Sequence, residues 1–176
     1  VISPDRPDPP RTLQAVGHGG GQLRAPRLPE YRENKSSHSA ISGIPHDFAA
    51  ERVIFGDLVP YGEIWRTGAN EATEITFYED VLFNSEKIKA GTYTLYTIPN
   101  KENWVVIINK VINTWGAYSY KDSLDVLRTS VMARNTAATL EDFSVTFKPT
   151  EYGSDLLMGW DDTFVEIPIQ KYSTLH

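Results

Sequence analysis

From about residue 52 onward, hydrophobic and polar residues alternate with the period of two that β-strands require. Phe143, Val145 and Phe147 alternate with polar neighbours, which predicts a strand with one buried face and one wet face. Residues 156–160 and 165–169 repeat this alternation. Runs of β-branched and aromatic residues predict further strands at residues 74–78, 81–83, 92–98, 104–108 and 126–131. The pattern therefore predicts about eight strands.

The connections between these segments are short and polar. Residues 99–103 separate two strongly apolar segments and are typical of a β-hairpin. Short strands at such spacing predict an all-β fold, either an antiparallel β-sandwich or a barrel-like variant of it. Pro168 lacks a backbone N–H and favours an edge position for its strand. Only residues 123–127 and 133–140 look briefly helical.

The first fifty residues have a different character. They hold 12 of the 23 Gly and Pro residues of the chain, and their scattered apolar residues follow neither a helical nor a strand period. They carry six basic and five acidic groups, whereas the remainder carries 11 and 18. We therefore predict an irregular Gly/Pro-rich arm over residues 1–50 and a single β-sandwich domain over residues 51–176. Because ordering such an arm is entropically costly, it is a candidate for docking on a protein partner or another subunit.

Composition narrows the class of protein. The 176 residues contain no Cys, which excludes disulfides, thiolate metal sites and a cysteine nucleophile. A net charge of −6 argues against nucleic-acid binding as the main task. No apolar run approaches the roughly 20 residues that a transmembrane helix needs. No cofactor or metal is predicted. The sequence has no phosphate-binding loop motif, and His18, His38 and His46 are not spaced as metal ligands usually are.

The segment from residue 61 to 73 is the densest in groups that make directional bonds. An arginine beside an indole face and carboxylates can hold an anionic or sugar ligand, so Trp65, Arg66, Asn70 and Glu71 are candidate binding residues. Gly68 is expected to supply a positive φ that turns the chain back. The plainer alternative is that Trp65 closes the core while the Arg66 guanidinium satisfies loop carbonyls.

A second aromatic segment covers residues 115–120. Trp115, Tyr118 and Tyr120 lie between predicted strands and could present stacking faces to a sugar or a peptide. Alternatively, Trp115 closes one end of the sandwich. A glycine neighbour at a loop position fits both interpretations.

Catalytic motifs are weak. Glu63, Glu71, Glu74 and Asp80 could form the carboxylate pair of a hydrolase acting on a carbohydrate or ester. The His-Gly-Gly-Gly string at residues 18–21 resembles an esterase oxyanion loop, but the chain has no Gly-x-Ser-x-Gly elbow. No catalytic residue is assigned, and the sequence favours a protein that is not an enzyme.

Several motifs, taken in order, resemble a known family. Residues 54–62 and 65–73 supply the first block, and residues 90–99 supply the second. Trp104 with residues 107–109, Trp115-Gly116 and residues 125–128 continue the series. Together they resemble the bacterial family catalogued as domain of unknown function 2911, over about residues 52–169. The first fifty residues depart from that pattern.

This resemblance implies an exported domain with no established activity, and it supplies no catalytic residues. The sequence thus predicts an exported, non-enzymatic binding or accessory module of the cell envelope, in the periplasm, at the outer membrane or outside the cell. Its ligand would be a carbohydrate or another small molecule. A hydrolase using carboxylates near Arg66 and a structural subunit of a larger envelope assembly are the alternatives.

Overall fold

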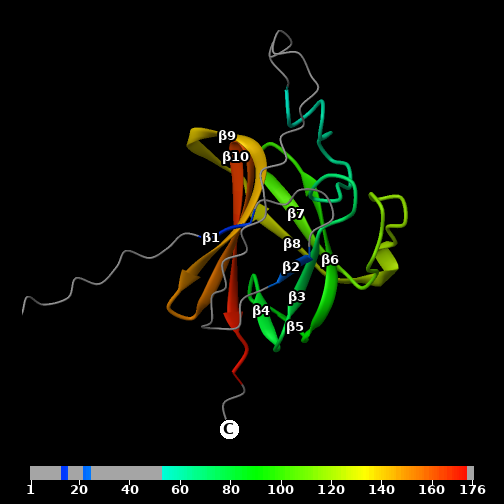
Figure 1. The fold of residues 1–176 in the computed structure, drawn as a ribbon, viewed down its shortest axis with the longest axis vertical. Helices are drawn as coiled ribbons and strands as arrows, with labels where there is room; N and C mark the ends of the chain where they lie inside the picture. The colour runs from blue at the N-terminus through cyan, green and yellow to red at the C-terminus, as the bar shows by residue number, and fades with distance from the viewer. Residues whose placement is uncertain (1–12, 16–21, 25–52, 174–176) are drawn as a thin grey trace, which may run out of the picture.

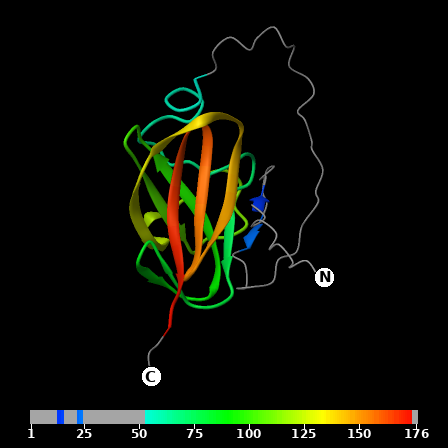
Figure 2. The same ribbon diagram turned by 90° about the vertical axis from the view of Figure 1, so that its left-hand side faces the viewer.

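Two β-sheets stacked face to face form the body of the molecule (Figures 1 and 2). The computed structural model describes residues 13–15, 22–24 and 53–173. Sheet A has the strand order β1 (Leu13–Ala15), β9 (Arg134–Thr150), β10 (Gly153–Lys171), β4 (Val81–Phe83) and β5 (Glu86–Ile88). Sheet B has the order β2 (Gln22–Arg24), β3 (Glu74–Phe77), β6 (Gly91–Pro99), β7 (Asn103–Asn109) and β8 (Asp125–Met132).

The predicted sandwich is confirmed. The predicted segments lie in β3, β4 and β6 to β10, whereas β5 was not predicted, and the pairings among β3 to β10 are antiparallel. The short β2 pairs with β3 in parallel. In Figure 2 the long strands β9 and β10 lie in front of the green strands of sheet B, as an open sandwich requires.

Period-two alternation builds the core between the sheets. On β9 and β10 the inward side chains include Phe143, Val145, Leu156 and Met158, which are buried as predicted. Among the described residues, the largest fully buried side chain is Trp104 of β7. Because an aromatic side chain removes a large area from water, this cluster supplies much of the hydrophobic driving force.

Strand β10 turns back on itself at Asp161, which has a positive φ of 56°. A Cβ atom added at Gly153 would lie 2.0 Å from the carbonyl oxygen of Ile169, so the two ends of β10 are in direct contact. The N–H of Lys171 also donates to the carbonyl of Tyr152 at 3.2 Å. The two alternating segments predicted at residues 156–160 and 165–169 are therefore the two arms of β10.

Two local expectations need correction. Residues 133–140 were expected to be helical, but β9 begins at Arg134, where it pairs with Phe164 of β10. Pairing with β10 overrides the helical preference of the alanines in this segment. Near residues 123–127 the structure has one short 3-10 helix, η2 (Asp122–Leu124), followed at once by β8.

Pro168 lies in a strand that has neighbours on both sides of it in sheet A. Along β10, however, the pairing with β9 ends at Phe164, so Pro168 lies beyond that ladder. Its carbonyl still accepts the N–H of Asn84 at 2.8 Å. Because β10 has neighbours on both sides, it is not an edge strand, and the edge position predicted from Pro168 is wrong.

The N-terminal arm contributes two short strands that the sequence pattern did not predict. Strand β1 pairs with β9, and β2 pairs with β3. The rest of the arm, with its histidines, its glycine tract and its proposed docking role, lies outside the described residues. Within the described part of the chain, no helix is long and apolar enough to cross a membrane.

Candidate functional site

Two loops cover the outer face of sheet B, the face turned away from sheet A. One loop precedes β3 and spans residues 61–73, and the other follows β7 and spans residues 110–121. Figure 1 shows the second loop, in yellow-green, projecting from β6 and β7 on the side opposite β9 and β10. We call these two segments the outer loops.

A small hydrophobic cluster fixes the outer loops to the sheet. Tyr96 and Ile107 project from the outer face and are fully buried beneath the loops, together with Ala72. The Tyr120 ring packs edge-on against the Tyr96 ring, with centroids 5.2 Å apart. The hydroxyls of Tyr96 and Thr114 share a hydrogen bond of 3.1 Å. This second core makes both loops part of the folded domain.

The outer loops are also joined to each other through their backbones. The N–H of Ala72 donates to the carbonyl of Thr114 at 3.0 Å, and the N–H of Gly116 donates to the carbonyl of Asn70 at 2.9 Å. Between these bonds, Glu71 and Trp115 form an antiparallel bridge. The structure therefore brings Asn70, Glu71 and Trp115 together, although 44 positions separate the bridged pair in the sequence.

Large aromatic side chains stand exposed on this fixed framework. Trp115 is 62% exposed and Tyr118 is 92% exposed. Gly116 has a positive φ of 64°, and a Cβ atom added there would lie 2.8 Å from Cε2 of Tyr118. The Tyr118 ring therefore lies over Gly116, next to Trp115 in the chain. Asn70 and Glu71 are exposed beside them.

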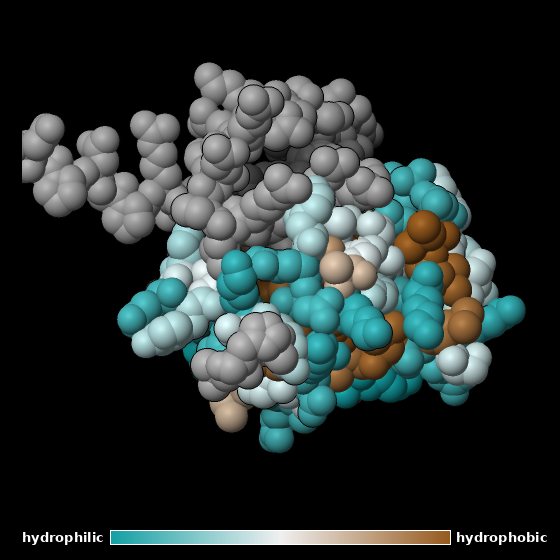
Figure 3. Space-filling view, turned by 90° about the horizontal axis from the view of Figure 1, so that it is seen from below, coloured by the Kyte–Doolittle hydropathy of each residue, from teal (hydrophilic) through white to brown (hydrophobic). Residues whose placement is uncertain are grey.

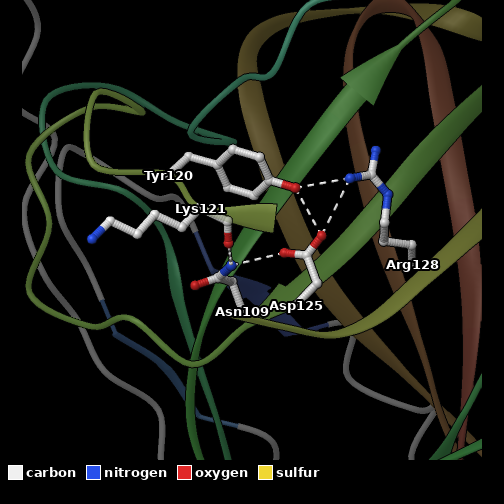
Figure 4. A network of polar contacts seen from close by, with 5 residues as sticks. All are labelled: Asn109, Tyr120, Lys121, Asp125 and Arg128. Carbon is white, nitrogen blue, oxygen red and sulfur yellow. Dashed lines mark hydrogen bonds and ion pairs between the residues drawn. The ribbon is translucent and has the colours of Figure 1, made fainter. Parts of the chain in front are cut away.

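A polar network ties the second outer loop to β7 and β8 (Figure 4). The Tyr120 hydroxyl donates to Oδ2 of Asp125 at 2.7 Å. Arg128 donates to the Tyr120 hydroxyl oxygen and to the same Oδ2. Nδ2 of Asn109 donates to Oδ1 of Asp125 at 2.7 Å and to the Lys121 carbonyl at 2.9 Å. Both carboxylate oxygens of Asp125 are therefore occupied.

The environment of Tyr120 keeps its phenol protonated. Burial, reinforced by the hydrogen bond to Asp125, raises the pKa of Tyr120 to about 12. A phenol with so high a pKa is a poor base or nucleophile near neutral pH, so its contacts favour a positioning role. Tyr120 was predicted as part of a contact surface, and in the structure its ring packs on Tyr96 and its hydroxyl bonds Asp125, so it supports the loop.

Further bonds hold the ends of the second outer loop. The N–H of Asn113 donates to Oε1 of Glu74 at 2.6 Å, and the hydroxyl of Thr94 donates to the carbonyl of Val111. The N–H of Lys110 donates to the carbonyl of Leu124 at 3.0 Å. These contacts fix the positions from which Trp115 and Tyr118 project.

Trp65 lies apart from this exposed surface, and Arg66 has no partner there. Trp65 is 8% exposed, packs edge-on against Trp104 and Phe143, and stacks on Trp160, so it closes the sandwich core. Arg66 is half-buried, and its side chain makes no hydrogen bond to any described residue. The alternative in which Arg66 satisfies loop carbonyls is therefore not seen in the described contacts.

The turn of the first outer loop also differs in detail from the sequence prediction. Thr67 and Asn70 adopt positive φ angles of 57° and 64°, whereas Gly68 does not. The strain at Thr67 is held by buried contacts, because its hydroxyl bonds to the Thr97 hydroxyl at 3.1 Å and its carbonyl accepts the Thr73 hydroxyl at 2.6 Å.

The carboxylates proposed for hydrolysis do not form one cluster. Glu63 and Glu71 are exposed, whereas Glu74 is buried and accepts the backbone N–H of Asn113. Asp80 binds Lys87 on sheet A. Across the residues that the structure describes, no group of three His, Asp or Glu side chains is placed to hold a metal ion. The hydrolase interpretation stays a prediction.

Another charged cluster lies on β9 and β10 of sheet A. Glu166 binds Arg134 at 3.0 Å and Lys148 at 3.1 Å, and Lys148 approaches Asp155 at 3.9 Å. Burial and the neighbouring Glu166 raise the pKa of the Asp155 carboxyl. All four charges here have partners.

Viewed from below, hydrophilic residues cover most of the described surface, and hydrophobic residues gather on one side (Figure 3).

Sequence reasoning missed Asn109, Asp125 and Arg128 as site residues. The spacing of Asp125 and Arg128 suggests ion pairing on a helix, but these residues begin a strand. A register shift between Ile108 and Asn109 brings Asp125 and Arg128 to the same face of the sheet. No sequence pattern marks that shift.

The comparisons with known proteins give one match. A family model described as a protein of unknown function (DUF2911) matches residues 46–169, which confirms the resemblance seen in the motifs. No curated protein and no solved structure matches the chain.

Proposed function

The chain belongs to the DUF2911 family of proteins of unknown function, and we propose that it is an exported, non-enzymatic binding module whose ligand is a saccharide. The binding surface is formed by Trp115 and Tyr118, with Asn70 and Glu71 at its margin. The arrangement of the outer loops carries this proposal.

The supporting observation is the exposure of two aromatic rings on a rigid support. Exposed apolar area is unfavourable in water, and large exposed aromatic side chains mark binding surfaces more often than chance positions do. Here the rings are 62% and 92% exposed, while the loops below them are held by a buried cluster and paired backbones. A preorganised surface loses little entropy when it binds a ligand.

The chemistry around the rings favours a sugar. Ring faces pack against the apolar C–H faces of pyranose rings, while the carboxylate of Glu71 and the amide of Asn70 can hydrogen-bond to hydroxyls. The residues beside the rings, Thr114, Gly116 and Ser119, are small or polar. A protein interface would need a more continuous apolar centre.

Export and the accessory role are parts of the same proposal. The family resemblance implies an exported domain, and saccharide polymers are abundant ligands outside the cytoplasm. A small β-sandwich that binds such a polymer without cleaving it would keep an attached or associated protein near its substrate.

The proposal is tested by isothermal titration of the purified protein with cellohexaose, chitohexaose and tetragalacturonate. We expect at least one of them to bind, and we expect Trp115→Ala and Tyr118→Ala each to weaken binding by about tenfold or more. Tyr152→Ala is the matched control, because Tyr152 is 68% exposed on the β9–β10 turn.

Two results would overturn the proposal. One is binding that survives both aromatic substitutions unchanged. The other is no binding of any of the three saccharides, whether or not a peptide library yields ligands that depend on Trp115.

A further inference from the structure

Arg66 lies at the start of the first outer loop. Its neighbour Trp65 pairs with Thr97 of β6 and points into the core, whereas Ile64 packs in the outer cluster. Because successive side chains in an extended segment point to opposite faces, Arg66 lies on the outer side with Ile64. The Arg66 carbonyl accepts the N–H of Thr73 at 3.1 Å, so Arg66 stands at the base of the loop that pairs with Trp115.

Arg66 differs from the other arginines whose side chains the structure describes. Arg128 binds Asp125 and Arg134 binds Glu166, at 3.2 Å and 3.0 Å. Arg66 makes no ion pair with any described carboxylate, although Glu63 and Glu71 are close to it in the sequence. Its Nε is buried and has no hydrogen-bond partner among the described residues.

An unpaired buried donor needs an explanation. Leaving such a group without a partner destabilises the folded protein, and more so when the group is charged. Acidic groups outnumber basic ones by 18 to 11 over residues 51–176, so a partner would be easy to supply from the protein itself. The Arg66 guanidinium instead has no carboxylate partner among the described residues, and Arg66 belongs to the loop whose tip pairs with Trp115.

A ligand carboxylate would balance the charge of the half-buried Arg66 side chain. The Nε of Arg66 is closed to solvent, but the two terminal nitrogens of a guanidinium also point in one direction and match the two oxygens of a carboxylate. A neutral hydroxyl has a single oxygen, so it does not match this pair of donors, and it does not balance the charge. Uronic acids carry a carboxylate directly on the sugar ring, so one oligosaccharide can supply both a stacking face and an anion.

We propose that the ligand is an acidic saccharide, and that Arg66 binds its carboxylate while the sugar chain packs on Trp115 and Tyr118. This inference rests on the proposed saccharide-binding function and adds its chemical class. Arg66 is then the residue that determines specificity for charge, and the aromatic rings determine specificity for sugar.

The test compares tetragalacturonate with its fully methyl-esterified form, which keeps the sugar chain and removes the charge. By isothermal titration, the wild-type protein is expected to bind the acid about tenfold more tightly than the ester. Arg66→Gln should bind the two forms equally, and Arg66→Lys should keep part of the preference, because lysine retains the charge without the planar fork. Arg134→Gln, on sheet A, should leave the preference unchanged.

Thermal melting of each variant separates a binding defect from a folding defect. If Arg66→Gln does not fold, Arg66→Lys still gives the answer, because an unchanged acid preference in that variant contradicts bidentate binding. Equal wild-type affinity for the acid and the ester, with binding still lost in Trp115→Ala, overturns the acidic-ligand inference alone. The acidic-ligand inference alone is also overturned if the wild-type protein binds neither form but binds a neutral oligosaccharide through Trp115. No saccharide binding at all overturns both proposals.

Discussion

Trp65 and Trp115 lie in two loops that cover the same sheet, yet they have opposite environments. Trp65 faces the other sheet, is 8% exposed, and contacts three aromatic rings. Trp115 faces outward, is 62% exposed, and belongs to a loop held by paired backbone rather than by its own ring. The inner side of sheet B thus provides stability, and the outer side has a surface that stability does not require.

The largest effect should come from the inner tryptophan. Trp65→Ala removes edge-on and stacked ring contacts from the core and leaves a cavity, so it is expected to reduce the free energy of unfolding by about 3–5 kcal/mol. Urea unfolding followed by circular dichroism measures this change. Trp65→Phe is the control and should lose much less. A loss below about 1 kcal/mol in Trp65→Ala would mean that Trp65 is not part of the packed core.

The next largest loss of stability should come from Asp125, which joins the second outer loop to the sheet. Asp125→Ala leaves the donors of Tyr120, Asn109 and Arg128 without their shared acceptor, and we expect a loss of about 1–3 kcal/mol. Asp122→Asn, an exposed acid in η2, is the control and should have little effect. If the two variants melt alike, the network does not support the loop.

The Tyr120 phenol should make stability fall at high pH. Its pKa is about 12 in the folded protein against an ordinary 10.0, so the folded state holds the proton more tightly than the unfolded state does. The resulting stabilisation is complete below pH 10 and is lost as the pH rises from 10 through 12. The difference in unfolding free energy between the wild-type protein and Tyr120→Phe should therefore shrink between pH 9 and pH 11.5. A constant difference over that range would show that the phenol titrates normally.

The smallest effect on stability should come from the exposed rings. Trp115→Ala and Tyr118→Ala are expected to change the unfolding free energy by no more than about 0.5 kcal/mol, because neither ring is buried. Differential scanning calorimetry of the two variants provides the measurement. A loss comparable to that of Trp65→Ala would remove the contrast between the two sides of sheet B.

Much of the fold could be predicted because the alternating pattern is local. Phe143, Val145 and Phe147 point inward as their spacing predicts, and the two arms of β10 were both visible in the sequence. The error at residues 133–140 has a clear cause. Alanines there favour a helix in isolation, but the segment that begins at Arg134 pairs with a strand thirty positions away.

The candidate site could be predicted only in part. The sequence nominated Asn70, Glu71, Trp115 and Tyr118, and the structure brings the first three together at the Glu71–Trp115 bridge and sets Tyr118 beside them. It could not separate Trp65 from Trp115, because a tryptophan next to turn residues has the same local signature in a core and on a surface. That distinction depends on which face of sheet B each loop covers.

The most direct test of the proposed binding surface is acrylamide quenching of tryptophan fluorescence, with and without a saturating amount of the oligosaccharide that the protein binds most tightly. Trp115 should account for the readily quenched emission, so this component should be absent from Trp115→Phe and should be protected when the ligand binds. If saturating ligand leaves the quenching of Trp115 unchanged, the ligand does not cover the outer loops and the account is wrong.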